Sequence, residues 1–251
     1  KQINLIYKEK FLNSISVEEK EEYLLCSYDT DYSKRKKMVI MFKKDISEIM
    51  NRRFLYQFQA CEIFLLNGKS YFFNFFSEDK KIEFFDHFRV IQKTYSQLKV
   101  ITDLKEDFRT KDYTRKWLAG KMSNLHYLLM VNKYASRSYN DTNQYPVLPW
   151  VTLRDGTLRN LQFSTAAQTE AQKMYLGEKY DMGVTAFPAH YNIHFSNSSF
   201  VIYYMVRVNP FTNGQITLQS GKFDAPNRQM HSLDECMMIL DRSHDSRELI
   251  P

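Results

Sequence analysis

Glycine, proline and cysteine are scarce in this 251-residue sequence, which contains 7 Gly, 6 Pro and 3 Cys. The low glycine and proline content argues against a collagen-like or low-complexity chain. The three cysteines, Cys26, Cys61 and Cys236, lie far apart and form no CxxC pair. Their odd number does not indicate a disulfide framework, so a reducing compartment fits best.

Long apolar runs are also missing. The longest run of note, FVIYYMV at 200–206, is too short to span a bilayer as a helix. The sequence begins at Lys1 without Met and has no apolar h-region, so we expect no signal peptide. Its abrupt end at Leu249-Ile250-Pro251 suggests a fragment of a longer protein.

A strong charge imbalance is absent as well. The formal charge is +6, with 20 Lys and Arg against 17 Asp and Glu through residue 110 and 15 against 12 after it. This mild, even excess is unlike the concentrated basic footprint of a nucleic-acid-binding protein, so we expect no nucleic-acid partner. A weak attraction to anionic membrane surfaces stays open.

Apolar and aromatic residues are plentiful, at 43% and 15%, so a substantial core can form. Residues 1–37 carry charged runs that we expect in solvated loops or at strand edges. Residues 38–76 are rich in β-branched and aromatic residues and predict strands in MVIMF, RFLYQFQACEIFLL and KSYFFNFF. Between the last two, Asn67-Gly68 predicts a hairpin with a type I′ turn.

An amphipathic helix is predicted next, capped by Ser77, with apolar residues spaced three and four apart at Phe84, Phe88, Ile91, Tyr95 and Leu98. Strands closed by one helix predict a small helix-capped β-sandwich or barrel. Residues 99–111 are expected to form a polar connector. Further helices are predicted from Asp112 or Thr114 to Leu118, after Ser123 with Asn132 on the face of Leu125, over 164–181 with Met174 inward, from Ser199 to Asn209, and over 231–240.

The stretch GKFDAPNR at 221–228 contains a glycine, a lysine, an aspartate and an arginine. It fails as a nucleotide-binding Walker loop, because Ile216 stands where the first glycine is needed and Phe223 follows Lys222. We therefore interpret it mainly as scaffold, with Gly221 in a conformation that other residues avoid. A role for Lys222 or Arg228 in a peptide groove stays open.

Four separated motifs resemble the BEACH domain. They are RSYND with QYPVLPWV (137–151), VIYYMVRVNPFT (201–212), LQSGKFDAPNRQMHSL (218–233) and SRELIP (246–251). The third is similar to the family's LQGGKFDxxDRxFHSI, with Ser220, Asn227 and Met230 as departures. Upstream, DISEIMNRRFLYQFQACEIFLLNGKSYFFNF (45–75) resembles the pleckstrin-homology-like (PH-like) domain that precedes BEACH domains.

The resemblance implies an α+β fold, in which a PH-like β-sandwich with a C-terminal capping helix packs on a mostly α-helical BEACH domain with irregular core segments. We place the PH-like domain at 1–98, a linker at 99–111 and a BEACH domain at 112–251 that lacks its C-terminal part. The implied function is a non-enzymatic scaffold in vesicle trafficking, lysosome-related organelles or autophagy. Its implied location is cytoplasmic, peripheral on endomembranes.

Two groups of residues are site candidates. The resemblance suggests that Arg52 and Glu62, which interrupt apolar strands, face the BEACH domain and lock the two domains together. A groove near this interface would bind a peptide segment of a protein partner through a few buried anchors. The candidates for that groove are Tyr145, Trp150, Arg207, Lys222 and Arg228, each of which also fits a core role.

Other functions have weaker support. His190 and His194 have zinc-compatible helical spacing but no evident third ligand, and the sequence contains no GxSxG motif. We therefore predict no catalytic residue, metal or cofactor. A peripheral membrane adaptor that binds anionic lipids through its basic surface is the alternative to a protein-binding scaffold.

Overall fold

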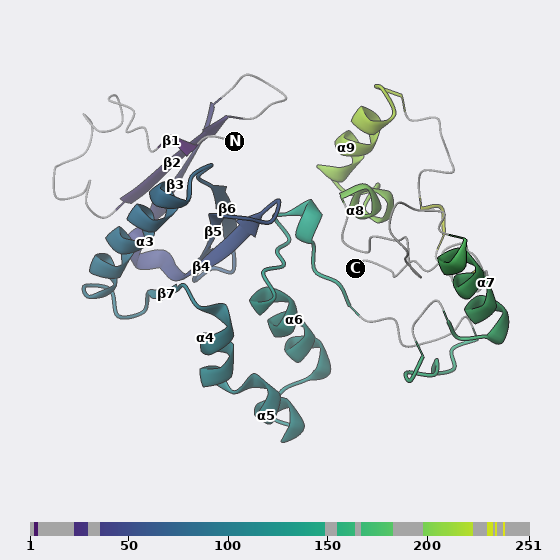
Figure 1. Cartoon of the computed structure of the whole chain (residues 1–251). Coiled ribbons are helices and arrows are strands. Elements are labelled where there is room, and N and C mark those ends of the chain that lie inside the picture. The colour runs from purple at the N-terminus through teal and green to yellow at the C-terminus, as the bar shows by residue number, and fades with distance from the viewer. Residues whose placement is uncertain are drawn as a thin grey trace. The chain divides into compact units, whose positions relative to one another are not determined.

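The structure is a computed structural model that describes residues 3–4, 23–29, 36–148, 155–163, 167–182, 198–222, 230–232, 234 and 238 (Figure 1). The chain divides into two compact units, Lys1–Ser136 and Arg137–Pro251. The first contains strands and helices, and the described elements of the second are helices, so the fold is α+β as predicted. The predicted domain boundaries at 98 and 112 stay a prediction.

The first unit contains two sheets. Strands β1 (Ile3–Asn4), β2 (Tyr23–Asp29) and β3 (Lys36–Phe42) form an antiparallel sheet in that order. The 3-10 turn η1 (Lys43–Asp45) leads into the second sheet. Its order is β6-β5-β4-β7, built from β4 (Ile46–Phe54), β5 (Gln57–Leu65), β6 (Ser70–Asn74) and β7 (Lys99–Ile101), with β7 parallel to β4.

Helix α3 (Glu78–Gln92) closes one face of the second sheet. Its predicted N-cap is confirmed, since the Ser77 hydroxyl accepts a hydrogen bond from the Lys80 amide. The helix ends at Gln92, so Tyr95 and Leu98 lie beyond it rather than on its face, yet both still pack into the same core. That core is completely apolar and includes Met41, Ile46, Ile49, Cys61, Ile63, Phe73, Phe84, Phe85 and Phe88.

Two hairpin turns differ from the sequence prediction. The Asn67-Gly68 hairpin forms, but its type I′ turn is wrong: Gly68 has φ +83 and Asn67 has no positive φ. The Gly68 amide donates to the Leu65 carbonyl, as in a type I turn followed by a left-handed glycine. A second, unpredicted turn divides RFLYQFQACEIFLL, because Leu55 and Tyr56 take φ values of 48 and 65 between β4 and β5.

The residues that we expected to be a polar connector contain regular structure, namely β7 and helix α4 (Leu104–Lys111). Helix α5 (Tyr113–Leu118) and the Ser123-capped helix α6 (Asn124–Tyr134) form where predicted. Asn132 is buried as expected, whereas Leu125 is exposed. Helices α5 and α6 are held together by the parallel rings of Trp117 and Tyr127, whose centroids are 4.7 Å apart.

The second unit contains η2 (Thr142–Gln144), α7 (Glu170–Asp181), α8 (Ser198–Tyr204) and α9 (Phe211–Leu218). Helix α7 begins six residues later than predicted, where Thr169 and Gln172 form a capping box. Met174, expected to point inward, is exposed. Helix α8 ends at Tyr204 rather than at Asn209, and α9 was not predicted. Most of the predicted helix over 231–240 lies outside the described residues.

Candidate functional site: a pocket on the outer face of the second sheet

The second sheet is buried on both faces in its central strands. In β5 the four consecutive residues from Ala60 to Ile63 are all buried. Because successive side chains point to opposite faces of a sheet, Cys61 and Ile63 belong to the core under α3, while Glu62 points to the other face. On that outer face Glu62 meets Arg52 of β4, which is also buried.

Arg52 and Glu62 form a buried ion pair. The Arg52 Nε donates to Glu62 Oε2 at 2.9 Å, and the two side chains are 0% and 2% exposed. The Ser70 hydroxyl of β6 donates to the other carboxylate oxygen at 3.0 Å. A charge buried this deeply is tolerated only when it is paired and hydrogen-bonded, so the pair determines how this face is built.

Arg52 also contacts α6. Its Nη1 donates to the Lys133 carbonyl at 2.7 Å. Lys133 lies in the last turn of α6, where backbone carbonyls have no partner within the helix and carry the negative end of the helix dipole. The guanidinium therefore satisfies a helix end and a strand carboxylate at the same time.

A second polar cluster joins the same elements. Glu48 of β4 forms ion pairs with Lys111 of α4, at 3.3 Å, and with Lys133 of α6. Asp107 of α4 pairs with Lys111 at 2.8 Å and accepts a hydrogen bond from the Tyr134 hydroxyl. These half-buried groups connect β4, α4 and α6, and the sequence analysis did not identify them.

The pKa values of this cluster reflect its pairing. Burial by itself raises the pKa of Glu48, but Lys133 and Lys111 outweigh it and hold that pKa below its ordinary value of 4.5. The pKa of Asp107 is also lowered, since Lys111 and Tyr134 overcome the effect of burial. Burial and the Asp107 carboxylate raise the pKa of Tyr134. Both carboxylates are therefore ionised at neutral pH.

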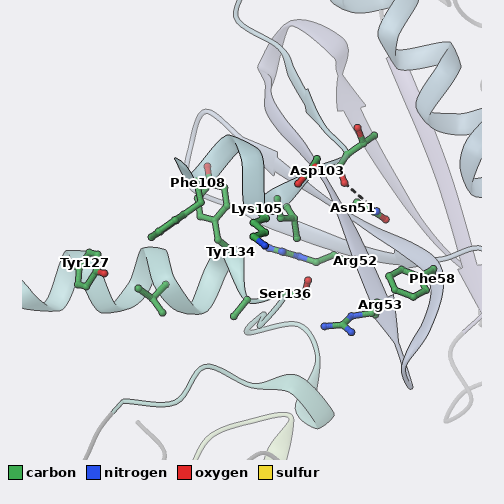
Figure 2. Close-up of a pocket in the computed structure, with 14 residues that line it drawn as sticks. Asn51, Arg52, Arg53, Phe58, Asp103, Lys105, Phe108, Tyr127, Tyr134 and Ser136 are labelled. Atoms are coloured by element: carbon green, nitrogen blue, oxygen red, sulfur yellow. Dashed lines mark hydrogen bonds between the residues drawn. The ribbon is translucent and has the colours of Figure 1, made fainter. Parts of the chain in front are cut away.

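Next to these contacts lies a pocket of about 720 Å³ (Figure 2). Its strand wall comes from Asn51, Arg52, Arg53 and Phe58 of β4 and β5. The segment from Thr102 to Lys105 and Phe108 form a second wall. The third comes from α6 and the residues after it, namely Tyr127, Val131, Tyr134, Ala135 and Ser136. The volume lies within the ordinary range for ligand sites.

Some polar side chains of the pocket already have hydrogen-bond or ion-pair partners among the described residues, and others do not. Arg52 is occupied by Glu62 and Lys133, and the Asp103 carboxylate accepts from the Glu106 amide as the N-cap of α4. The guanidinium carbon of Arg53 lies 5.6 Å from the centroid of the Phe58 ring, and Figure 2 labels both side chains. The exposed Lys105 and the half-buried Arg53 form no ion pair with any residue that the structure describes.

None of the predicted groove residues that the structure describes is among those that line this pocket. Tyr145 is 5% exposed and packs in a small core with Val201 and the rings of Tyr139 and Phe211, which agrees with the core role that we kept open. Arg207 is exposed and donates to the carbonyls of Met230 and His231.

The remaining predictions concern Lys222 and Gly221, which the structure describes, and four residues that it does not. Lys222 is exposed, and Gly221 has φ +86 as expected. Trp150 and Arg228 fall outside the described residues, as do His190 and His194. The groove role of all five candidates stays a prediction.

The sequence offered one usable signal for this site and lacked others. A single acidic residue within an apolar strand singled out Glu62, and the same signal in ISEIM would have identified Glu48. No comparable pattern marks Lys111, Lys133 or the pocket walls, because these residues lie on strands and helices that are far apart in the sequence.

No group of three or more His, Cys, Asp or Glu side chains is placed to hold a metal ion in the described part of the chain. None of the helices described there has both the length and the apolar character that crossing a bilayer requires.

Comparison with known proteins finds two family models, and each matches a segment that contributes a wall of the pocket. The family model described as the PH domain associated with Beige/BEACH matches residues 4–87, and the Beige/BEACH domain model matches 115–251, more than half of the chain. The strand wall of the pocket therefore comes from the first match and the α6 wall from the second.

Three relatives are similar over most of this chain. A putative neurobeachin homolog of Caenorhabditis elegans is 34% identical over 230 residues, which cover 83% of this chain and 9% of the relative. The BEACH domain-containing protein lvsE of Dictyostelium discoideum is 33% identical, with 83% and 10% covered. The lysosomal-trafficking regulator of Drosophila melanogaster is 32% identical, with 82% and 6% covered. The chain thus spans a tenth or less of these relatives, and its two matched segments show that it belongs to the BEACH family, with the PH-like domain associated with that family before the BEACH domain.

Proposed function

We propose that this chain is a non-enzymatic, protein-binding scaffold module of a larger protein that acts in membrane trafficking. The name of one relative supports the trafficking role, since it is a lysosomal-trafficking regulator. The proposed location is cytoplasmic and peripheral on endomembranes, and the proposed processes include organelle size control and autophagy.

The observation that carries the proposal is the pocket with walls from both matched segments. A concave, largely aromatic and aliphatic site with a few polar groups is the usual form of a ligand-binding site. Its volume of about 720 Å³ suits one or two side chains of a peptide segment and is too small for a folded domain. We therefore propose that a peptide segment of a partner protein binds here.

The proposal assigns Arg52 and Glu62 to the domain interface, together with the Glu48 cluster. Arg52 reaches the α6 carbonyl of Lys133, and Glu48 reaches the Lys133 ammonium group, so both hold one pocket wall against the other. A Glu62→Lys variant would place like charges together in a buried position. We expect faster amide hydrogen exchange in α6, and an unchanged exchange rate would contradict the interface role.

A matched pair of substitutions tests the pocket. Val131 of α6 lines it and is 38% exposed, whereas Val90 of α3 is 64% exposed and lies outside it. Val131→Trp would place a large ring in the pocket, and Val90→Trp adds the same ring to another helix surface. Proteins captured from cytosol by the 251-residue chain would be quantified by mass spectrometry for both variants. We expect partners that Val131→Trp loses and Val90→Trp retains, and identical sets would refute the proposed function.

A further inference from the structure

We propose that the pocket selects an acidic peptide segment that carries an apolar anchor. This inference rests on the proposed function and adds the chemical class of the partner. Four charged residues line the pocket: Arg52, Arg53 and Lys105 are basic, and Asp103 is acidic. The pocket is therefore basic, although the chain as a whole has only a mild positive excess.

Two of the basic side chains that line the pocket are free to contact a ligand. The charge of Arg52 is paired with Glu62, whereas the Asp103 carboxylate caps α4 through a neutral backbone amide and offsets one of the other two cations. Arg53 and Lys105 remain, and neither forms an ion pair with a described residue. Two cations beside one concave site favour a ligand that brings the missing negative charge, because like charges across an interface are costly.

Arg53 is held in a form suited to carboxylate recognition. Its guanidinium carbon lies 5.6 Å from the centroid of the Phe58 ring, within the range of a cation–π contact. Such a contact orients the planar group, and its N–H donors match the geometry of a carboxylate. An aspartate or glutamate side chain of a peptide fits this arrangement.

The apolar walls provide the place for an anchor. Phe58 is 54% exposed and Val131 is 38% exposed, and both line the pocket. Burial of these side chains against a ligand removes apolar surface from water, and a few such buried anchors dominate most interfaces. The concave shape favours an extended peptide over a bilayer, since a flat lipid surface does not enter a pocket.

The test measures peptide preference with the intact 251-residue chain. Three pools of fluorescent peptides of about ten residues share a central Leu, Phe, Tyr or Trp and differ in having acidic, amide or basic flanking residues. Binding is followed by fluorescence anisotropy for the unmodified chain, for Arg53→Gln/Lys105→Gln and for Val131→Trp. The matched control is Lys80→Gln/Lys121→Gln, which removes two exposed cations outside the pocket. Circular dichroism and urea unfolding confirm that each variant is folded.

We expect the acidic pool to bind tightest. Because an exposed ion pair contributes modestly, Arg53→Gln/Lys105→Gln should weaken binding of the acidic pool about two- to thirty-fold, with little effect on the amide pool. The control should change neither pool, and Val131→Trp should weaken both. The preference for the acidic pool should also fall as salt rises from about 50 to 300 mM.

Other results overturn the inference in distinguishable ways. If the acidic and amide pools bind equally and Val131→Trp weakens both, the acidic class is wrong and the proposed function stands. If Val131→Trp leaves every pool unaffected, or if no pool binds, the pocket is not the binding site and both fail. Sedimentation with phosphatidylserine vesicles that is lost in Arg53→Gln/Lys105→Gln, without any peptide binding, assigns the two cations to lipid instead.

Discussion

Loss of the buried Arg52 side chain should strongly destabilise the first unit, and Arg52→Met is the substitution that tests this. Methionine keeps a long unbranched side chain but removes the guanidinium. The variant therefore leaves the Glu62 carboxylate, 2% exposed, without the opposite charge that lies 2.9 Å away in the protein. It also removes the hydrogen bond to the Lys133 carbonyl at 2.7 Å.

The magnitude follows from the cost of an uncompensated buried charge. Removal of one partner of a buried ion pair costs about 3–5 kcal/mol. For a chain of this size, a change of that magnitude lowers the melting temperature by about 6–20 °C. The double variant Arg52→Met/Glu62→Leu removes both charges and should regain most of the loss. The hydrogen bonds to the Lys133 carbonyl and from the Ser70 hydroxyl to Glu62 then stay missing, which corresponds to about 1 kcal/mol each.

The assay is urea unfolding followed by circular dichroism, with both single variants and the double variant completing a cycle. Amide hydrogen exchange in α6 reports separately whether the helix end loosens when the Lys133 contact is lost. A loss below about 1 kcal/mol for Arg52→Met would refute the argument that the buried charge needs its partner. A double variant as unstable as the single one would show instead that the α6 contact, and not the ion pair, supplies the stability.

Two further predictions follow from the same unit. Glu48 and Asp107 have lowered pKa values in the folded state, so their contribution to the free energy of unfolding is complete above their ordinary pKa values of 4.5 and 3.8 and is lost as the pH falls through the lower values. Glu48→Gln should therefore make the free energy of unfolding, measured with urea between pH 2 and 7, fall less steeply at acid pH. An unchanged acid dependence would contradict the pairing. The turn at Leu55 and Tyr56 has positive φ at two residues with side chains, so Leu55→Asn/Tyr56→Gly should raise the free energy of unfolding by about 1–3 kcal/mol. Gly68→Ala, at a glycine with φ +83, should lower it by about 1 kcal/mol. Equal effects of both changes in thermal unfolding would show that backbone strain is not the cause.

Local patterns in the sequence predicted the elements whose causes are local. Ser77, Ser123 and Gly68 mark two helix starts and a hairpin, because a cap or a left-handed turn depends on a few neighbouring residues. The turn at Leu55 and Tyr56 escaped prediction since neither residue favours positive φ. Likewise β7 has only three residues, and its strand conformation comes from pairing with residues of β4 that lie 51 positions earlier in the chain.

Residue type, spacing and motif order were enough to predict the α+β class, the family, and Arg52 and Glu62 as charges within apolar strands. Only the packing of strands against helices brings the guanidinium of Arg52 to both Glu62 and the end of α6, and gathers Glu48, Lys111 and Lys133 in one cluster. It also decided that Arg53 and Lys105 line the same pocket. The physical reason is that these contacts join residues as much as 85 positions apart, and such proximity arises only when separate strands and helices pack together.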